Sequence, residues 1–68
     1  MNKLAERLKQ TRKVKGLSQK EMAKLINVSQ STIAKWESGT REPSLDDLIL
    51  LANILGESTD FLLGRSDY

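Results

Sequence analysis

The sequence predicts an all-α protein of five short helices, and three observations lead to that prediction. Apolar residues recur at helical spacing in five segments, and no segment shows the strict alternation typical of a strand. All four glycines fall just after a proposed helix end, where a left-handed residue commonly stops the helix. A serine or threonine that can cap a helix precedes four of the five segments.

The first helix is expected from about Asn2 to Lys15, with Gly16 as its stop. Its inward face has four members at helical spacing: Leu4, Ala5, Leu8 and Arg12. Its remaining surface is strongly basic, with Lys3, Arg7, Lys9, Lys13 and Lys15 opposed only by Glu6. Such a surface fits a solvated face, a phosphate-facing surface or a membrane-surface helix, and the low apolar content disfavours the membrane.

Residues 18–37 predict two helices that meet at a sharp angle. The first extends from Gln19 to Ile26, because Ser18 is a good N-cap and Glu21 completes a capping box. Its expected apolar face consists of Met22, Ala23, Leu25 and Ile26. Asn27 then interrupts the pattern, and asparagine tolerates the left-handed conformation that a tight turn requires.

The second helix of the pair, residues 30–37, follows the N-cap Ser29 and stops at Gly39. Ile33 and Trp36 share its inward side. Its outward arc contains no acid and consists of Gln30, Ser31, Ala34 and Lys35. These groups suit base edges: an amide reads adenine, an ammonium guanine, a hydroxyl either, and a small apolar residue packs on the thymine methyl. An ordinary polar face is the alternative, and it is the commoner outcome for an isolated helix.

Two further helices follow a loop that contains Pro43, the single proline. Ser44 caps the first of them, two aspartates favour its positive N-terminal end, and Gly56 stops it. Its expected core stripe consists of Leu45, Leu48, Leu51, Ala52 and Leu55. The last short helix is defined by Ser58 or Thr59 as cap, residues 60–63, and Gly64 as stop.

Length and composition suit one globular domain, residues 1–68. Hydrophobic residues make up 38% and charged residues 29%, which is the composition of a folded, soluble chain. The net charge of +2 is weakly basic, so composition alone does not argue for nucleic acid. The absence of cysteine and of any apolar run near the ~20 residues that cross a membrane indicates a cytoplasmic protein.

No catalytic or metal-binding cluster is evident in the sequence. It has no histidine and no cysteine, and its acids are scattered or stand at helix starts. An acid–base pair, a nucleophile–base pair or a metal site would need such groups together. We therefore expect no enzyme activity, no cofactor, no metal and no small-molecule substrate, and no effector-sized pocket is evident.

A set of residues in register is more specific than any one of them: Arg12, Gly16-Leu17-Ser18-Gln19, Ile33, Trp36-Glu37-Ser38-Gly39, Pro43 and Asp60-Phe61-Leu62-Leu63. The chain from about Leu4 to Leu63 thereby resembles the phage-repressor helix-turn-helix family, the lambda-repressor-like or Xre/Cro-like DNA-binding domains. The resemblance implies a compact five-helix lambda-repressor-like domain, with the helix-turn-helix formed by its second and third helices. It also implies a prokaryotic or phage-encoded protein.

By this resemblance, the third helix is the recognition helix and enters the major groove, with Gln30, Ser31 and Lys35 at base-reading positions beside Ala34. Phosphate contacts are implied for Gln19, Ser29, Ser38, Thr40 and Arg41. Gln19 would also buttress Gln30, main-chain amides of residues 38–41 would bind phosphates, and Arg41 would lie near the minor groove.

Two further sets of residues acquire roles from the resemblance. Arg12 and Glu37 match an ion pair that ties the first helix to the end of the recognition helix. Family members pair across a two-fold axis, so the implied partner is a two-fold symmetric double-stranded DNA operator bound by a homodimer. The candidate dimer interface consists of Leu50, Ile54, Phe61 and Leu62. Leu50 and Ile54, one turn apart, fit an extension of the core equally well.

The leading function is therefore a sequence-specific double-stranded DNA-binding transcriptional regulator, acting as a repressor. A small helical protein-interaction module that docks through Leu50 and Ile54 is the alternative. A gel shift against random duplexes at moderate salt separates the two.

Overall fold

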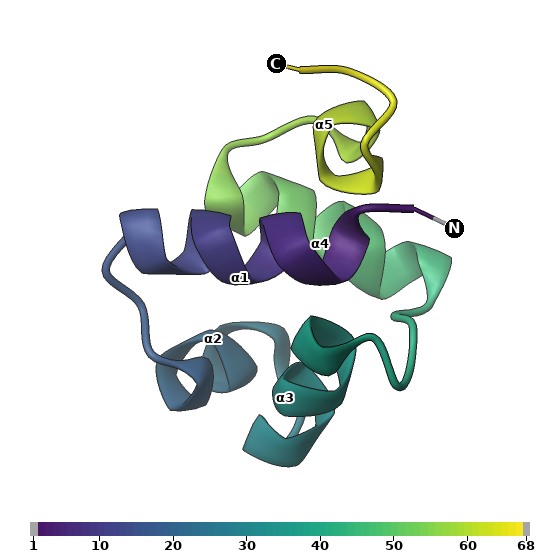
Figure 1. Cartoon of the computed structure of the whole chain (residues 1–68). Helices are drawn as coiled ribbons and strands as arrows, with labels where there is room; N and C mark the ends of the chain where they lie inside the picture. Colours follow the sequence, from purple (N-terminus) through teal and green to yellow (C-terminus); the bar gives the residue numbers. More distant parts are fainter. Residues whose placement is uncertain (1, 68) are drawn as a thin grey trace.

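A computed structural model describes residues 2–67, and these residues form five α-helices (Figure 1). In order they are α1 (Leu4–Val14), α2 (Gln19–Ile26), α3 (Gln30–Ser38), α4 (Leu45–Leu55) and α5 (Thr59–Leu63). The described residues include no strand, and the predicted fold class is confirmed.

Local capping explains where the helices begin. The side chains of four serines accept a hydrogen bond from the backbone N–H three residues on: Ser18, Ser29, Ser44 and Ser58. Ser58, and not Thr59, is thus the cap of α5. α1 starts at Leu4, later than predicted, because the Asn2 side chain accepts a hydrogen bond from the Leu4 N–H and Lys3 is not helical.

The helix ends also follow the predicted stops. Gly39, Gly56 and Gly64 are left-handed C-caps of α3, α4 and α5. α3 is one residue longer than predicted and ends at Ser38. α1 ends at Val14, one residue before the predicted Lys15, which becomes its C-cap.

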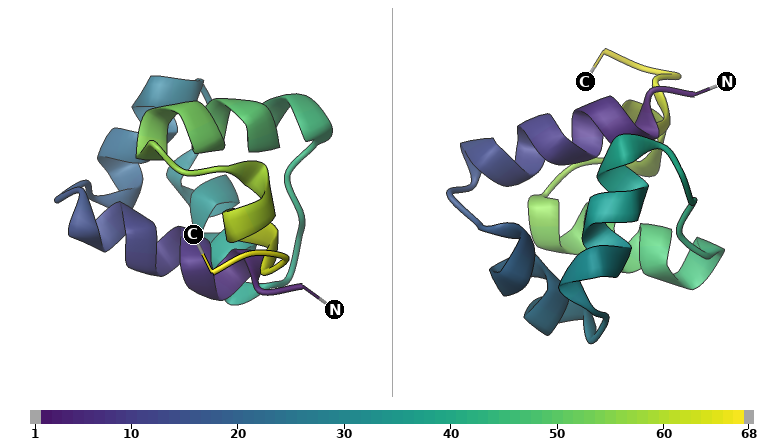
Figure 2. Two further views of the ribbon diagram at one scale, coloured as in Figure 1. Left: turned by 90° about the horizontal axis from the view of Figure 1, so that it is seen from above. Right: turned by 60° about the horizontal axis from the view of Figure 1, so that its bottom comes forward.

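α1 crosses the middle of the molecule and separates the helix pair α2–α3 from α5 (Figure 1). It packs on α3 and on α5, while α4 packs on α2 and on α5. α3 lies at the surface, where its outer side is not covered by another helix (Figure 2).

One apolar cluster holds the helices together. It consists of Leu4, Leu8, Met22, Ala23, Ile26, Ile33, Trp36, Leu48, Leu51, Ala52, Leu55 and Leu62. The prediction was wrong for Leu25 and Leu45, whose side chains are 58% and 79% exposed. Leu25 lies about 100° around α2 from the centre of the buried face, by helical spacing. Leu45 is the first residue of α4, at an edge of the molecule.

Candidate nucleic-acid interface

A tight turn between α2 and α3 sets the angle of the helix pair. Asn27 adopts the left-handed conformation that the sequence predicted, with φ 60° and ψ 47°. The N–H of Val28 donates to the carbonyl of Ala23 at 3.0 Å, which closes the end of α2. Ser29 caps α3 from the next position, because its hydroxyl accepts from the Thr32 N–H at 3.1 Å. α3 is therefore presented by a turn whose backbone is hydrogen-bonded at both ends.

The outward side of α3 carries the residues that were predicted to read bases. Gln30, Ser31 and Lys35 are exposed, and Ala34 is half-buried. The Ser31 hydroxyl lies 3.2 Å from that of Ser29, the capping residue. The Gln30 and Lys35 side chains make no hydrogen bond or ion pair within residues 2–67. This arc is thus a set of polar groups that remain available to a partner.

The inward side of α3 is anchored by the predicted ion pair. Arg12 Nε donates to Glu37 Oε2 at 2.6 Å and Arg12 Nη2 donates to Glu37 Oε1 at 3.0 Å. Arg12 Nη1 also donates to the carbonyl of Leu17 at 2.7 Å. Only 3% of the Glu37 side chain is exposed. The hydrogen bond to Glu37 raises the pKa of Arg12, which favours the charged guanidinium in the fold.

Gln19 joins this ion pair instead of supporting Gln30. Its Nε2 donates to Glu37 Oε1 at 3.1 Å, and among the described residues it makes no hydrogen bond to Gln30. In this structure Gln19 therefore supports Glu37, because a charged acceptor makes the stronger hydrogen bond. A primary amide has two N–H groups, so one donor of Gln19 remains for a phosphate.

The segment after α3 folds back onto the helix end. The backbone N–H groups of Thr40 and Arg41 donate to the carbonyl of Lys35 at 3.0 and 3.3 Å. The Ser38 hydroxyl donates to the same carbonyl at 3.1 Å and contacts the Thr40 hydroxyl. The amides of residues 40 and 41 are therefore already used, contrary to the prediction that they bind phosphates. The exposed side chains of Thr40 and Arg41 are the remaining candidates.

The candidate dimer interface is only partly at the surface. Leu62 is fully buried in the core, so its assignment to an interface was wrong. Ile54 and Phe61 are half-buried and pack against the core. Leu50 is exposed, and Ile49, which the sequence interpretation passed over, is 53% exposed. Helical spacing shows that α4 carries apolar residues on two faces. Which of the two faces is covered depends on how the neighbouring helices pack against it.

Phe61 is held by Arg7 of α1. The Arg7 guanidinium lies 4.4 Å from the centroid of the Phe61 ring, and Nη1 donates to the Phe61 carbonyl at 2.7 Å. The same nitrogen donates to the carbonyl of Ser66 at 2.6 Å. These contacts fasten α5 and the following turn to the start of α1.

The small net charge conceals a strong separation along the chain. Residues 1–41 contain ten cations and three acids, a net charge of +7. Residues 42–68 contain one cation and six acids, a net charge of −5. The half of the chain that holds α1, α2 and α3 is therefore strongly basic, which is the electrostatic footprint expected of a nucleic-acid surface.

Residues 2–67 contain neither a candidate metal site nor a candidate membrane span. No group of three or more acidic, histidine or cysteine side chains is arranged to hold a metal ion. None of the helices in residues 2–67 is long and apolar enough to cross a membrane.

Two short helices joined by a tight turn, the second of which (α3) is exposed outward and anchored inward by the buried Arg12–Glu37 pair, define the class: a helix-turn-helix protein. The helix-turn-helix family model HTH_3 matches residues 8–62, and the chain belongs to this family. It is 50% identical over 58 residues to the SPbeta prophage-derived uncharacterized HTH-type transcriptional regulator YonR of Bacillus subtilis, covering 85% of this chain and 54% of YonR. It is 38% identical over 64 residues to the HTH-type transcriptional regulator ImmR of Bacillus subtilis, covering 94% of this chain and 50% of ImmR.

A solved structure shares the whole fold. The P22 c2 repressor protein in complex with a synthetic operator superposes with a TM-score of 0.88 and 30% identity. The match covers 97% of this chain and 100% of that chain. By contrast, the chain spans only about half the length of the curated relatives YonR and ImmR.

Proposed function

We propose that this chain is a sequence-specific double-stranded DNA-binding transcriptional regulator that acts as a repressor. The observation that carries the proposal is the acid-free outward arc of α3, whose Gln30 and Lys35 side chains have no partner within residues 2–67. Membership of a family that includes an operator-bound repressor supports the same function.

In this proposal α3 enters the major groove and its outward residues read bases. Gln30 and Lys35 have the donors and acceptors for adenine and guanine edges, with Ser31 and Ala34 between them. Phosphate contacts come from Gln19, Ser29, Ser38, Thr40 and Arg41. The N-terminal half of the chain supplies the positive potential that attracts the duplex.

We further propose that two copies bind a two-fold symmetric operator, with half-sites about 34 Å apart, one turn of DNA. The surface for the second copy is the outer side of α4, where Leu45, Ile49 and Leu50 are exposed. Three side chains bury far less than the roughly 1,200 Å² typical of a stable interface, so pairing is weak off the DNA. Footprints that protect two symmetric half-sites support the dimer, and a single protected half-site contradicts it.

The same α4 surface favours a second candidate function, a helical protein-interaction module. The two functions differ in one measurement, the selection of bound duplexes from a random pool at moderate salt. Enrichment of a shared motif supports sequence-specific binding. Retention of all duplexes alike, with affinity lost steeply as salt rises, indicates a basic surface without readout. No retention at all favours the protein-interaction module.

A further inference from the structure

Three side-chain hydroxyl groups meet at the start of α3. Ser29 Oγ lies 3.2 Å from Ser31 Oγ and 2.8 Å from Thr32 Oγ1. As the cap of the helix, Ser29 Oγ also accepts the backbone N–H of Thr32 at 3.1 Å. The Ser31 and Thr32 hydroxyls make no other hydrogen bond within residues 2–67. Ser29 is therefore the centre of a hydroxyl chain, Ser31–Ser29–Thr32.

The bonding capacity of Ser29 limits how the hydroxyl chain can be arranged. A hydroxyl group has one hydrogen to donate and two lone pairs that accept. The Thr32 N–H occupies one lone pair of Ser29, so one hydrogen and one lone pair remain for two neighbouring hydroxyls. For both contacts to be hydrogen bonds, Ser29 must donate to one neighbour and accept from the other.

The two arrangements give Ser31 opposite properties toward a base. Where Ser29 donates to Thr32, the Ser31 hydrogen is bound to Ser29, and Ser31 offers only lone pairs to the outside. Where Ser29 donates to Ser31, the Ser31 hydrogen stays free. In the major groove, the exocyclic amino groups of adenine and cytosine need an acceptor, whereas the exocyclic oxygens of guanine and thymine need a donor. The direction of the hydroxyl chain thus decides which exocyclic group Ser31 can bind.

We propose that Thr32 is a positioning residue that controls, through Ser29, whether the Ser31 hydroxyl donates to DNA or accepts from it. This inference rests on the proposed function, in which Ser31 reads a base. The Thr32 hydroxyl can accept from Ser29 or donate to it, so it completes either arrangement. Thr32 is half-buried and lies outside the outward arc of α3 by helical spacing, so its effect on DNA passes through Ser31.

The hydroxyl chain leaves the proposed phosphate contact of Ser29 to its backbone. In both arrangements the hydroxyl hydrogen of Ser29 is bound within the chain. The backbone N–H of Ser29 donates to no described residue and remains for a phosphate. Ser29 therefore contacts the phosphate and orients Ser31 through different groups.

Removal of the Thr32 hydroxyl should favour one arrangement. Thr32→Val keeps the capped N–H and the shape of the side chain, but Ser29 retains only Ser31 as a hydroxyl neighbour. If Ser31 donates to Ser29 in this variant, the Ser29 hydrogen has no acceptor except water. Ser29 should therefore donate to Ser31, which favours guanine or thymine over adenine or cytosine. We expect a shift of about threefold, the low end for one neutral hydrogen bond, because water partly replaces the lost acceptor.

The hydroxyl chain itself is tested without DNA, by urea unfolding of single and double variants. The fold-change in the unfolding equilibrium constant caused by Ser29→Ala should be about threefold smaller in the Thr32→Val background. Ser44→Ala is the matched control. Its hydroxyl accepts the Asp47 N–H at the same 3.1 Å and contacts no second hydroxyl among the described residues. Ser44→Ala should cost the same in both backgrounds, and equal costs of Ser29→Ala in both would overturn the chain.

The effect on base reading is measured at the base pair where Ser31→Ala relaxes the preference. Duplexes with each of the possible base pairs there are bound to the parent, Thr32→Val and Thr32→Ser. Thr32→Val should show the threefold shift at this base pair alone, while Thr32→Ser, which keeps the hydroxyl, should retain the preference of the parent. The shift should vanish when Ser31→Ala is added to Thr32→Val. None of these proteins carries Ser29→Ala, so the result stands even where that variant fails to fold.

The possible failures have different meanings. An unchanged preference in Thr32→Val, or an equal loss of affinity on every duplex, would overturn the positioning role. A shift that persists with Ser31→Ala would place Thr32 itself at a base, and the same shift in Thr32→Ser would exclude the hydroxyl as its cause. A parent chain that selects no motif would refute the proposed function and the base reading with it, while the unfolding measurement still decides whether the hydroxyl chain exists.

Discussion

The two sides of α3 use their polar groups in opposite ways. On the inward side, the Glu37 carboxylate accepts hydrogen bonds from both Arg12 and Gln19 and is almost completely buried. On the outward side, Gln30 and Lys35 are exposed and make no side-chain hydrogen bond within the described residues. The inward groups hold the helix in place, whereas the Gln30 and Lys35 side chains make no polar contact that holds the fold. The difference separates residues that determine stability from residues that can determine specificity.

The largest effect is expected where the inward side is broken. Glu37→Ala leaves the buried Arg12 charge without its partner, which should lower the free energy of unfolding by about 3 kcal/mol. For a chain of this size, the melting temperature should fall by at least about 10 °C. Thermal unfolding followed by circular dichroism measures the change.

A double variant identifies the cause. Arg12→Met combined with Glu37→Leu removes both charges, so most of the lost stability should return. DNA affinity of folded Glu37→Ala should decrease alike for all duplexes. Unchanged stability together with altered sequence preference would show that Glu37 reads DNA and does not position α3.

On the outward side the expected effects are on binding and not on stability. Gln30→Ala and Lys35→Ala should each change the free energy of unfolding by less than about 0.5 kcal/mol. Each should cost about 1–3 kcal/mol of binding on the selected site and relax preference at one position. Lys35→Ala should also reduce the salt dependence somewhat, since it removes a cation.

Binding of each variant to the selected site and to its single-base changes, at several salt concentrations, tests this division. Gln10→Ala is the matched control, because Gln10 is an exposed amide on α1 that is not part of the proposed interface. Uniform loss of affinity across the duplexes would mean that α3 holds DNA without reading it.

Gln19 lies between the two sides of α3, and its substitution should have a smaller effect than either. One N–H of the Gln19 side-chain amide donates to Glu37, and the other N–H is proposed to hold a phosphate. Gln19→Ala should therefore weaken binding to every duplex by about 1 kcal/mol, the value of a neutral hydrogen bond. Because no charge is removed, the salt slope should not change. A change of sequence preference in this variant would instead place Gln19 at a base edge.

The sequence was sufficient for the starts of α2 and α4 because capping is local. Ser18 and Glu21, or Ser44, act on a backbone group three residues away, so neighbouring residues contain the whole cause. The Arg12–Glu37 pair links residues far apart in the chain, and it was predicted through resemblance and not through spacing.

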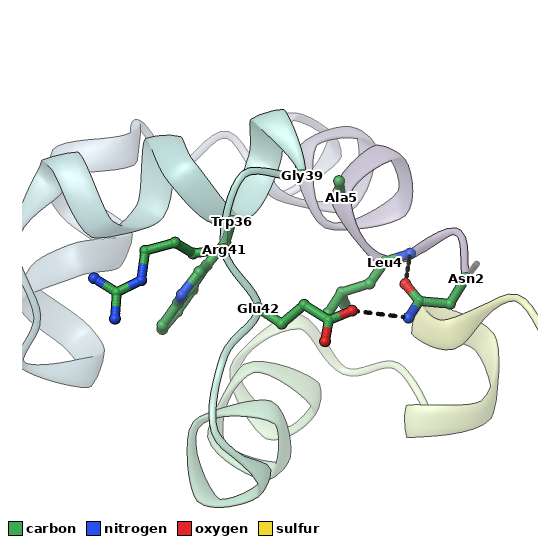
Figure 3. Close-up of a pocket in the computed structure, with 7 residues that line it drawn as sticks. All are labelled: Asn2, Leu4, Ala5, Trp36, Gly39, Arg41 and Glu42. Atoms are coloured by element: carbon green, nitrogen blue, oxygen red, sulfur yellow. Dashed lines mark hydrogen bonds between the residues drawn. The ribbon is translucent and has the colours of Figure 1, made fainter.

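Errors arose where tertiary packing decides. Helical spacing places Leu25 and Leu45 near an apolar face, but cannot show that no neighbour covers them. Leu62 was assigned to an interface because its spacing cannot show that the packing of α5 buries it in the core. The pocket of about 310 Å³ that Leu4, Trp36 and Arg41 line (Figure 3) was not predicted, because these residues come together only in the folded chain.

The smallest expected effect is electrostatic and concerns the start of α2, the helix that carries Gln19. The Glu21 carboxylate accepts the Ser18 backbone N–H at 2.8 Å, and this bond, followed by the Ser18 hydroxyl, lowers the pKa of Glu21 below its ordinary value of 4.5. Near that value the unfolded chain binds more protons than the folded chain, so stability decreases as pH falls through the lowered pKa.

Glu21→Gln isolates this contribution, because glutamine preserves the capping box and removes only the charge. The parent should be more stable than the variant above pH 4.5, and the difference should shrink as pH falls through the lowered pKa of Glu21. Urea unfolding of both proteins at several pH values measures the difference. A difference that stays constant with pH would assign the effect to hydrogen-bond geometry and not to charge. Because Glu21 is exposed and Glu37 is buried, this change should be far smaller than that of Glu37→Ala, as expected if burial sets the energetic weight of a carboxylate.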